Sequence, residues 1–401
     1  MLLEADEADR YERSFRIEAL SAWDEPVIIC TADLVLGLIQ NNRRSLFSFP
    51  SIANGAFVFD EIHQYDEHLF GSLLRFLEAF RGTPILLMTA SLPTSRRSAI
   101  QKILEKAERK LEIIEGPSDL EEIKRYELAG PVKEPPWGEL STNLRKDGKV
   151  LWVANTVNRC IEFARQAREK GLEPLLYHSR YRYGDRVQRH NAVVQAFKES
   201  GKTLAVTTQV CEVSLDLSAD LLVTDLAPIP ALIQRMGRLN RRVTPDNPGV
   251  PKRVLILDVD KSLPYPQEEF ILDGIRKWVA DLSGAPISQA DLARSFQEFS
   301  RNQLPSINSI KSAWLDGGPL SEPLPLREAT AQIPVLRQED ASLCMSNNKP
   351  ILKEITRYSI PMPLGQVAKE FGQWRRLGFA FVAPEGRIDY SEEWGAKWAK
   401  K

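Results

Sequence analysis

The feature that most constrains the fold of this chain is the alternation of short apolar runs with helical patterns up to about residue 260. The apolar runs are Val27–Cys30, Ala56–Phe59, Ile85–Met88, Val150–Val153, Pro174–Tyr177, Leu204–Thr207, Leu221–Thr224 and Val254–Leu257. Several are apolar throughout, which is typical of strands buried on both faces of a parallel sheet. Helical patterns over Val157–Lys170 and Arg186–Ser200 each end just before a glycine. This order of elements predicts an open parallel α/β sheet.

Changes in composition divide the chain into lobes. Residues 131–148 are rich in Pro, Gly and charge and lack a sustained period, so we expect a linker there. A first lobe over 1–130 and a complete second lobe over 149–260 flank it. Residues 261–401 combine helical patterns with proline-interrupted strand-like pieces and predict a mixed α+β C-terminal accessory domain. The first lobe has only three convincing strands, which leaves edges exposed and the core thin, so we expect a segment to be missing in front of it.

Composition argues against several classes of protein. The formal net charge is −1, so any polyanion must be held by local basic clusters. The four cysteines lie far apart without a C-x-x-C pair, which supports neither a zinc site nor a disulfide framework. No apolar run approaches the ~20 residues that a membrane span needs, and the first residues lack a signal-peptide pattern. We therefore expect a cytoplasmic protein with no membrane partner.

The strongest local signal is the sequence AFVFDEIHQYD, in which an apolar strand ends in Asp60 and Glu61, with His63 close behind. Ligands of open parallel sheets bind at the carboxyl ends of the strands, so both acids are expected to face a crevice. One carboxylate can hold Mg²⁺, which prefers few protein oxygens together with phosphate oxygens. The other can orient or deprotonate the water that attacks a γ-phosphate. The alternative is a solvated turn that merely leaves the strand.

Thr89 and Ser91 follow the next apolar strand. Their hydroxyls can hydrogen-bond across to the acidic turn and sense its occupant. The alternative is a strand exit that caps the helix expected near Ser95–Glu108, because Ser and Thr are favoured N-caps. Taken by itself, this second interpretation is the better one.

The segment IPALIQRMGRLNRR predicts a helix that carries Gln234, Arg235, Arg238, Arg241 and Arg242. Spacings of three and four place Arg235, Arg238 and Arg242 on one face. Guanidinium groups bind phosphate oxygens bidentately and act as arginine fingers on a transferring phosphoryl group. The alternative is a solvated basic face, although Gly237 within the helix, at a cost of about 1 kcal/mol relative to Ala, indicates close packing.

Two loops offer groups for a nucleic acid. Leu204–Asp216 leads from a strand into hydroxyl, amide and acidic side chains, namely Thr207, Thr208, Gln209, Glu212, Ser214 and Asp216. The neutral groups suit phosphates or sugars, and the acids can order the arginines. Tyr177–Arg189 interleaves arginines with tyrosines, which suits a single strand because charge holds the backbone and rings stack on bases. A solvated turn capped by the following helix is the alternative for this second loop.

The ordered combination of these motifs is more specific than any one of them. Asp-Glu-x-His, Thr-Ala-Ser, Thr-Thr-Gln…Glu…Leu-Asp and Gln-Arg-x-Gly-Arg-x-x-Arg resemble motifs II, III, V and VI of superfamily 2 DExH helicases. More narrowly, the sequences VIICTADLVLGLI, FVFDEIHQYD, TASLP, VANTVNRCIEFA, YHSRYRYGDR, TTQVCEVSLDLSAD and APIPALIQRMGRLNRR resemble the helicase of type I CRISPR interference. The resemblance covers roughly residues 20–260 and implies two RecA-like parallel-sheet lobes, the first incomplete.

The resemblance also implies a role for each matching residue. Asp60 would coordinate Mg²⁺ and Glu61 would activate water. ATP would be bound by both acids and, from the second lobe, by Gln234, Arg238, Arg241 and Asp216, with Arg238 and Arg241 as the fingers. The residues that couple the nucleotide site to the DNA track would be His63, Thr89 and Ser91. The single-strand path would be lined by Thr31, Asn155, Thr156, Arg180, Thr208 and Gln209.

The implied function is an ATP-dependent 3′–5′ DNA helicase of CRISPR antiviral defence. Its partners would be single-stranded DNA, the CRISPR surveillance complex and a separate HD nuclease chain, because the four histidines form no His-Asp pair. The sequence contains no G-x-x-x-x-G-K-[ST] motif, and the family's upstream glutamine motif is also absent, so we expect little or no ATP hydrolysis by this chain alone. Two alternatives stay open: a non-catalytic product that binds nucleic acid or the complex, and a different superfamily 2 motor.

Overall fold

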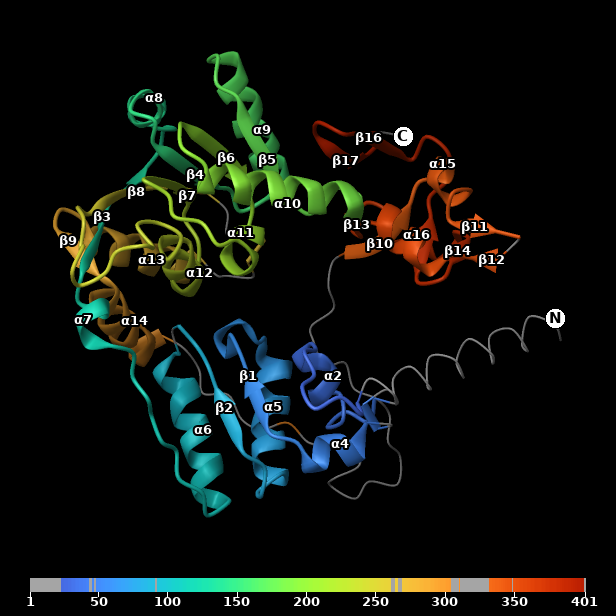
Figure 1. The fold of residues 1–401 in the computed structure, drawn as a ribbon, viewed down its shortest axis with the longest axis horizontal. Helices are drawn as coiled ribbons and strands as arrows, with labels where there is room; N and C mark the ends of the chain where they lie inside the picture. Colours follow the sequence, from blue (N-terminus) through green and yellow to red (C-terminus); the bar gives the residue numbers. More distant parts are fainter. Residues whose placement is uncertain are drawn as a thin grey trace. The chain divides into compact units, whose positions relative to one another are not determined.

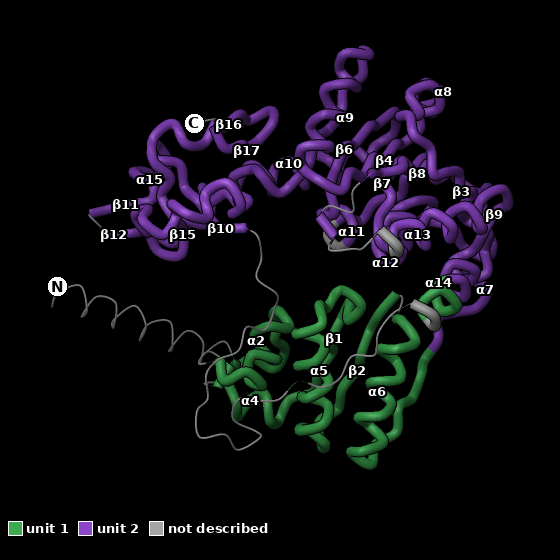
Figure 2. The backbone as a smooth tube through the Cα atoms, turned by 180° about the vertical axis from the view of Figure 1, so that it is seen from behind, with its two compact units in different colours: residues 1–114, 296–330 green, residues 115–295, 331–401 purple. Residues whose placement is uncertain are grey.

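The computed structural model describes residues 23–42, 45–46, 48–90, 92–260, 264–265, 269–303, 310, 332–347 and 349–399. They form two compact units, coloured green and purple in Figure 2. The first unit takes its described residues from 1–114 and 296–330, and the second from 115–295 and 331–401. In the described part of the chain, no helix is long and apolar enough to cross a membrane.

The first unit is built on a small parallel sheet in which β1 (Phe57–Phe59) pairs with β2 (Ile85–Leu87), as Figure 1 shows. Its helices are α2 (Ala32–Leu36), α4 (Phe49–Asn54), α5 (Glu67–Ala79) and α6 (Thr94–Lys106), and a 3-10 turn, η1, spans Ile62–Gln64. α5 starts where the Asp66 carboxylate accepts a hydrogen bond from the Leu69 amide at 2.8 Å, a regular N-cap. Its apolar stripe buries Phe76 edge-on against Phe57 and Phe59.

One predicted strand is absent from this unit. Among the described residues no strand pairs with Val27–Cys30, and the side chains of Val27 and Ile29 are 80% and 98% exposed. The prediction of a strand there was wrong for a physical reason: an apolar run becomes a strand only where a neighbouring strand supplies the ladder. In the described residues β1 is hydrogen-bonded to β2 alone.

The second unit contains a large, mostly parallel sheet whose order over the described residues is β5-β6-β4-β7-β8-β3-β9. Its strands are β3 (Lys124–Val132), β4 (Lys149–Val153), β5 (Pro174–Tyr177), β6 (Thr203–Thr207), β7 (Leu221–Asp225), β8 (Lys252–Leu257) and the antiparallel β9 (Pro286–Ser288). Its helices are α7 (Ser118–Glu121), α8 (Trp137–Arg145), α9 (Val157–Glu169), α10 (Tyr183–Lys198), α11 (Val210–Ser214), α12 (Ile229–Met236), α13 (Glu269–Leu282) and α14 (Gln289–Gln303), the last of which runs on into residues of the first unit. The central strands β4, β6 and β7 are buried along their whole length. Apart from Val27–Cys30, each predicted strand is present, with ends shifted by at most two residues, and the predicted parallel α/β fold is confirmed.

Two predicted boundaries differ from the structure. Residues 131–148, expected as a linker, contain the end of β3 and helix α8, whose Leu140 and Leu144 are buried in the core of the sheet. Residues from 261 onward, expected as accessory domain, include α13, which packs on β3, and β9, which extends the sheet. In both segments proline and glycine suggested irregular chain. The pairing of β3 with β8, and of β9 with β3, nevertheless gave them regular structure.

The described residues after 331 form the expected mixed α+β part. The sheet β13-β10-β15-β14 is its centre, with β10 (Gln332–Leu336), β13 (Ile360–Pro363), β14 (Arg376–Leu377) and β15 (Ala380–Val382). Around it lie α15 (Gln338–Ala341), α16 (Leu352–Tyr358), the 3-10 turn η2 (Phe371–Gln373), and the hairpins β11 (Met345–Ser346)–β12 (Lys349–Pro350) and β16 (Ile388–Ser391)–β17 (Gly395–Trp398). Helix α16 of this part packs on α10, a helix that flanks the large sheet.

Candidate functional site

The acidic turn after β1 has an unusual backbone. Glu61 has φ +52°, a left-handed conformation that non-glycine residues adopt rarely and mostly for a functional or turn-forming reason. Its amide donates to the Asp60 carboxylate at 2.9 Å, and the next amide, of Ile62, donates to the Met88 carbonyl at 3.2 Å. The turn is therefore tied to the end of β2, with the Asp60 side chain left exposed.

His63 connects the two strand ends. Its Nδ1 lies 3.1 Å from the Thr89 hydroxyl and 3.3 Å from a carboxylate oxygen of Glu61. Burial lowers the pKa of His63 to about 4, with Arg96 acting in the same direction and Asp60 against it. The imidazole is thus neutral at neutral pH, so its contact with Glu61 is not an ion pair between two full charges. The structure brings His63 and Thr89, two of the predicted coupling residues, together beside Glu61.

Two residues near this turn need separate mention. Ser91, the other predicted coupling residue, lies outside the described residues. Arg96, which no motif signalled, donates to the carbonyls of Ile62 and His63 at 3.2 and 3.3 Å and lies over the Phe70 ring. It holds the acidic turn from α6, and nothing in its spacing along the sequence pointed to this contact.

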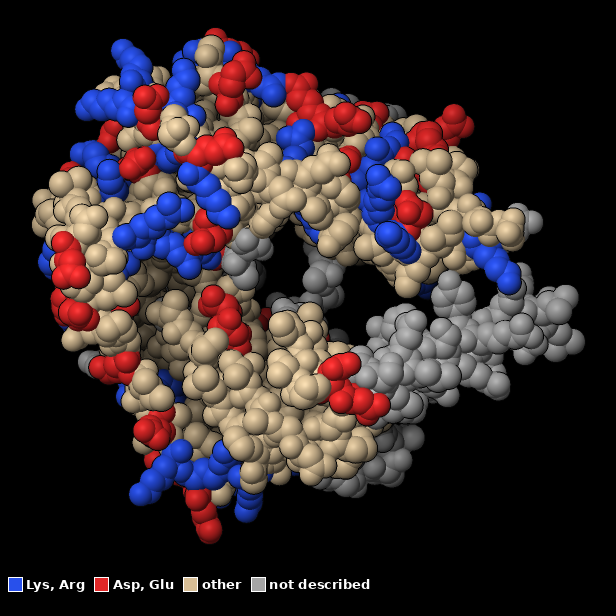
Figure 3. Space-filling model, viewed as in Figure 1, with Lys and Arg blue, Asp and Glu red and all other residues tan. Residues whose placement is uncertain are grey.

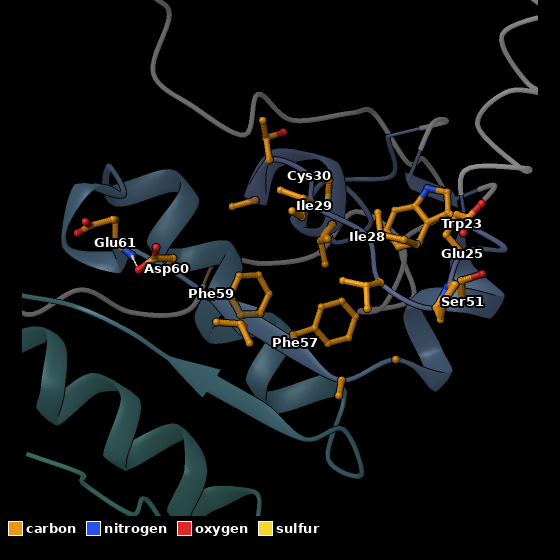
Figure 4. A pocket seen from close by; sticks show the side chains of 18 of the residues that line it. Trp23, Glu25, Ile28, Ile29, Cys30, Ser51, Phe57, Phe59, Asp60 and Glu61 are labelled. Carbon is orange, nitrogen blue, oxygen red and sulfur yellow. Dashed lines mark hydrogen bonds between the residues drawn. The ribbon is translucent and has the colours of Figure 1, made fainter. Parts of the chain in front are cut away.

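A cavity of about 930 Å³ lies beside β1 in the first unit. Asp60 and Glu61 are at one end, whereas Trp23 and Glu25 are at the other, and Figure 4 shows Phe57 and Phe59 between them. Thr31, predicted to lie on the nucleic-acid path, also lines this cavity. The two acids therefore lie at one end of a cavity that apolar side chains also line.

The second unit gathers predicted nucleic-acid residues at the carboxyl edge of its sheet. Asn155 and Thr156 follow β4, and Thr208 and Gln209 follow the adjacent β6. Gln209 Nε2 donates to the Asn155 carbonyl at 2.6 Å, and Thr156 caps α9 by accepting from the Arg159 amide. Asn155 and Thr208 are nearly buried, at 2% and 3% exposure. Neighbouring parallel strands explain why these residues meet.

The sequence predicted that the arginine-rich segment forms one helical face. In the structure it does not. α12 ends at Met236, so Arg238 and Arg241 lie beyond the helix. Arg238 donates to the carbonyl of Cys211 at 3.1 Å and to that of Glu212, whereas Arg241 pairs with Asp216 at 3.5 Å in solvent. The half-buried Gln234 is still on α12. The pairing of Arg241 with Asp216 agrees with the expectation that acids order the arginines.

Arg235 was not assigned a role from the sequence, yet it is the most deeply placed charge of this segment. Its side chain is 0% exposed and forms an ion pair with Glu212 at 2.8 Å. An arginine inside the apolar stripe of α12 was the signal that could have revealed it, because buried charge occurs only where partners converge.

The basic and aromatic loop before α10 mainly contacts the C-terminal part. Tyr181 is buried, stacks on His178 and donates to the Glu393 carbonyl at 2.8 Å, so the expectation that its ring stacks on bases was wrong. Arg182 forms a bidentate pair with Asp340. Arg180 donates to Asn158 at 2.8 Å, and its predicted place on the single-strand path stays a prediction.

Charge on the surface is mixed in sign. Lys and Arg are interspersed with Asp and Glu over the second unit, as Figure 3 shows, in line with the net charge of −1. Asp60 and Glu61 belong to the first unit, and Arg238 and Arg241 to the second. That these acids and arginines face one another across an ATP-binding cleft stays a prediction.

Comparisons with known proteins bear on the family. A sequence profile described as CRISPR-associated nuclease/helicase Cas3, C-terminal, matches residues 146–244. A Myxococcus xanthus protein named CRISPR-associated nuclease/helicase Cas3 is 43% identical over 389 residues, which cover 96% of this chain and 51% of that protein. This chain therefore spans about half the length of that relative.

Two solved structures share the fold. The crystal structure of T. fusca Cas3-AMPPNP aligns with a TM-score of 0.66 and 17% identity, over 92% of this chain and 55% of that one. A chain of the CRISPR RNA-guided surveillance complex, pre-nicking, aligns with a TM-score of 0.64 and 17% identity, over 95% of this chain and 59% of that one. In fold the chain is similar to these structures, and in sequence it is similar to CRISPR-associated nuclease/helicase Cas3 proteins over about half of their length. This similarity agrees with the resemblance that the ordered motifs predicted.

Proposed function

We propose that this chain is the motor part of a 3′–5′ DNA helicase that uses ATP and Mg²⁺ to unwind target DNA in CRISPR antiviral defence. The observation that carries the proposal is the acidic turn: Asp60 and Glu61 end one parallel strand, and His63 links Glu61 to Thr89 at the end of the next. Glu61 would orient water, and His63 connects it to the end of the neighbouring strand. Such a connection suits a nucleotide site that has to transmit its state to the rest of the motor.

The residues at this turn fit the cofactors. Asp60 offers one exposed carboxylate, and Mg²⁺ bound with a nucleotide needs few protein oxygens, since water and phosphate supply the others. Mg²⁺ would offset charge on the phosphates. Glu61 would orient the attacking water and accept its proton. Gln234, Arg238, Arg241 and Asp216 would complete the nucleotide site from the second unit, with the two arginines binding phosphate oxygens.

The single-strand path would run along the carboxyl edge of the large sheet. Asn155, Thr156, Thr208 and Gln209 offer amide and hydroxyl groups there, with Arg180 and Thr31 as further contacts. Neutral donors of this kind hold a strand without reading its sequence, as a translocating motor requires.

We also propose two partners for this chain. Association with a surveillance complex is supported by the likeness to the chain in the pre-nicking structure. Degradation of the unwound strand would come from a separate HD nuclease chain. Cas3 relatives about twice as long leave room for such functions outside the part that this chain matches.

A second candidate is a non-catalytic product that binds nucleic acid or the surveillance complex. It is favoured by one observation: the sequence has no G-x-x-x-x-G-K-[ST] motif, whereas the second unit has a full sheet. Without that backbone cradle and lysine, the chain as it stands is expected to hydrolyse little or no ATP.

The test compares ATP hydrolysis by this chain with that of the chain extended by a segment bearing a P-loop motif. The extended chain is expected to release phosphate in a manner stimulated by single-stranded DNA, and Glu61→Gln to reduce turnover by about 10²-fold or more, because the base is lost. Glu105→Gln, on the exposed side of α6, is the matched control and should leave turnover unchanged. Full turnover by Glu61→Gln would remove the role assigned to Glu61, and an inactive extended chain would favour the second candidate.

A further inference from the structure

Arg235 is the centre of a buried polar network at the carboxyl edge of the large sheet. Its guanidinium donates to Glu212 Oε1 at 2.8 Å, Asn155 Oδ1 at 3.0 Å, Thr224 Oγ1 at 2.8 Å and the Asp225 carbonyl at 3.1 Å. It also donates to the hydroxyl of Tyr265 at 2.8 Å. The partners come from segments that are far apart in the sequence.

Stability alone does not explain a charge in this place. A buried ion pair gains little over well-packed apolar side chains, because desolvation of both charges offsets their attraction. Burial acts to lower the pKa of Arg235, but the Glu212 carboxylate acts against it and the pKa is raised, so the group stays charged. A planar fork with fixed donor directions is, however, well suited to orient several neighbours at once.

The neighbours that Arg235 orients are those of the proposed sites. On one side, Asn155 also accepts a hydrogen bond from Gln209, so two residues of the single-strand path are joined to the network. On the other side, Glu212 and the preceding Cys211 offer the carbonyls to which Arg238 donates. One guanidinium therefore contacts both the nucleic-acid side and the nucleotide side of the second unit.

Tyr265 is a member of this network that lies outside the quoted motifs. It lies between β8 and α13, on the chain that leaves the sheet. Burial raises the pKa of its hydroxyl, while Arg235 and a hydrogen bond from Gln209 act in the opposite direction. The neutral hydroxyl thus lies against both Arg235 and Gln209.

We propose that Tyr265 is a positioning residue for single-strand binding. Its hydroxyl holds Arg235 in place, and Arg235 in turn fixes Asn155, whose carbonyl holds the Gln209 side chain at the carboxyl edge of the sheet. This inference rests on the proposed function, because it needs the carboxyl edge of the sheet to be the single-strand path. Tyr265 itself touches no nucleic acid in this arrangement.

The test is equilibrium binding of a fluorescent single-stranded oligonucleotide to this chain, over a range of salt concentrations and well below its unfolding temperature. Tyr265→Phe removes only the hydroxyl and is expected to weaken binding about tenfold, the equivalent of one hydrogen bond to a charged group. The slope of log affinity against log salt should stay unchanged, because no phosphate contact is lost. Arg235→Lys, which keeps the charge but not the fork, should weaken binding at least as much.

Tyr126→Phe is the matched control. Tyr126 is a buried tyrosine and Tyr265 a half-buried one; the Tyr126 hydroxyl donates to Gln289 Oε1 at 3.1 Å and not to a residue of the path. It should lose a similar amount of stability and bind the oligonucleotide as the unaltered chain does. A loss of affinity in both variants would reduce Tyr265 to a general stabilising role and overturn the inference.

The remaining outcomes separate this inference from the proposed function. Equal affinities for Tyr265→Phe and the unaltered chain would overturn the inference alone. Weaker binding with a smaller salt slope would also overturn it, because Tyr265 would then act on a phosphate contact. No binding by the unaltered chain would overturn the proposed single-strand path, and the inference with it.

Discussion

At the scale of single residues, the arginines on and after α12 have separate surroundings although the sequence spaces them as a set. Arg235 is buried among side chains, Arg238 is held by two backbone carbonyls, and Arg241 pairs with Asp216 in solvent. Backbone carbonyls accept from the Arg238 guanidinium, whereas carboxylates accept from those of Arg235 and Arg241.

The first prediction concerns Arg238→Ala in the chain extended by a P-loop segment. Hydrolysis should fall by about 10³-fold, in the range known for arginine fingers, while the affinity for nucleotide changes much less. Single-turnover phosphate release and nucleotide titration measure the two quantities. Arg242→Ala, an exposed arginine of the same segment, is the control. A loss of binding without a loss of the hydrolysis rate would assign Arg238 to structure.

The second prediction concerns His178, which is fully buried. Burial lowers its pKa to about 3, with Arg180 and Arg189 adding to the effect, whereas an unfolded histidine has a pKa of about 6.5. Between these values the unfolded state binds the extra proton, so the free energy of unfolding is complete above pH 6.5 and is lost as the pH falls. At pH 5 the loss amounts to about 2 kcal/mol from this residue.

Denaturant unfolding at pH 7.5 and pH 5 tests this dependence. His178→Phe keeps a ring against Tyr181 but cannot titrate, so it should lose less stability on acidification than the unaltered chain. His63, in the other unit, titrates over a similar range. It contributes the same pH dependence to the unaltered chain and to His178→Phe. If the free energy of unfolding of the unaltered chain and of His178→Phe fell equally on acidification, His178 would not be the group responsible.

At the scale of elements, the hairpin β16–β17 depends on close backbone approach. Gly395 has φ +74°, and a Cβ there would meet the Arg180 carbonyl and lie 2.7 Å from His178 Cε1. The neighbouring amide of Ala396 donates to the same carbonyl at 2.7 Å. Only glycine allows both the left-handed backbone and the contact.

The third prediction is that Gly395→Ala releases this hairpin. Strain plus collision should cost roughly 3 kcal/mol, and the amides of β16 and β17 should exchange faster with deuterium than those of β6. Gly386→Ala is a close control, because Gly386 has φ +71° but nothing within 4 Å of a Cβ, so only the backbone cost of about 1 kcal/mol remains. Equal effects of the two changes would contradict the proposed collision.

At the scale of the whole molecule, the two units differ in how well their sheets are covered. In the first unit, one face of the small sheet packs on the core through Phe57 and Leu87, whereas Val58 and Leu86 on the other face are 61% and 46% exposed. Parallel strands are ordinarily buried on both faces. This apolar face is therefore expected to bind other apolar surfaces.

The fourth prediction is that Leu86→Thr lowers the binding of a hydrophobic dye and self-association, and changes the free energy of unfolding by no more than about 0.5 kcal/mol. Leu87→Thr, the next residue along β2, faces the core instead and should cost about 1–3 kcal/mol. Dye fluorescence, light scattering and denaturant unfolding measure the three effects. Similar stability losses in both variants would mean that the outer face is covered.

Much of the fold followed from pattern alone. Strands such as Val150–Val153 and Leu221–Thr224 were predicted because a strand buried on both faces has to be apolar throughout. The acidic turn and its neighbour Thr89 were predicted from their places at strand ends. Arg96, Arg235 and Tyr265 escaped prediction, because each acts through partners distant in sequence, and no local spacing reveals such contacts.

The sequence by itself determined the class of sheet, the order of the motifs and the strand ends at which the chemically active side chains lie, because burial periodicity and turn residues are local properties. Only the tertiary structure decided that Val27–Cys30 stays unpaired, that 124–132 joins the second sheet and that Arg235 is buried. Those outcomes depend on which distant strand supplies a ladder and which distant side chain supplies a hydrogen bond.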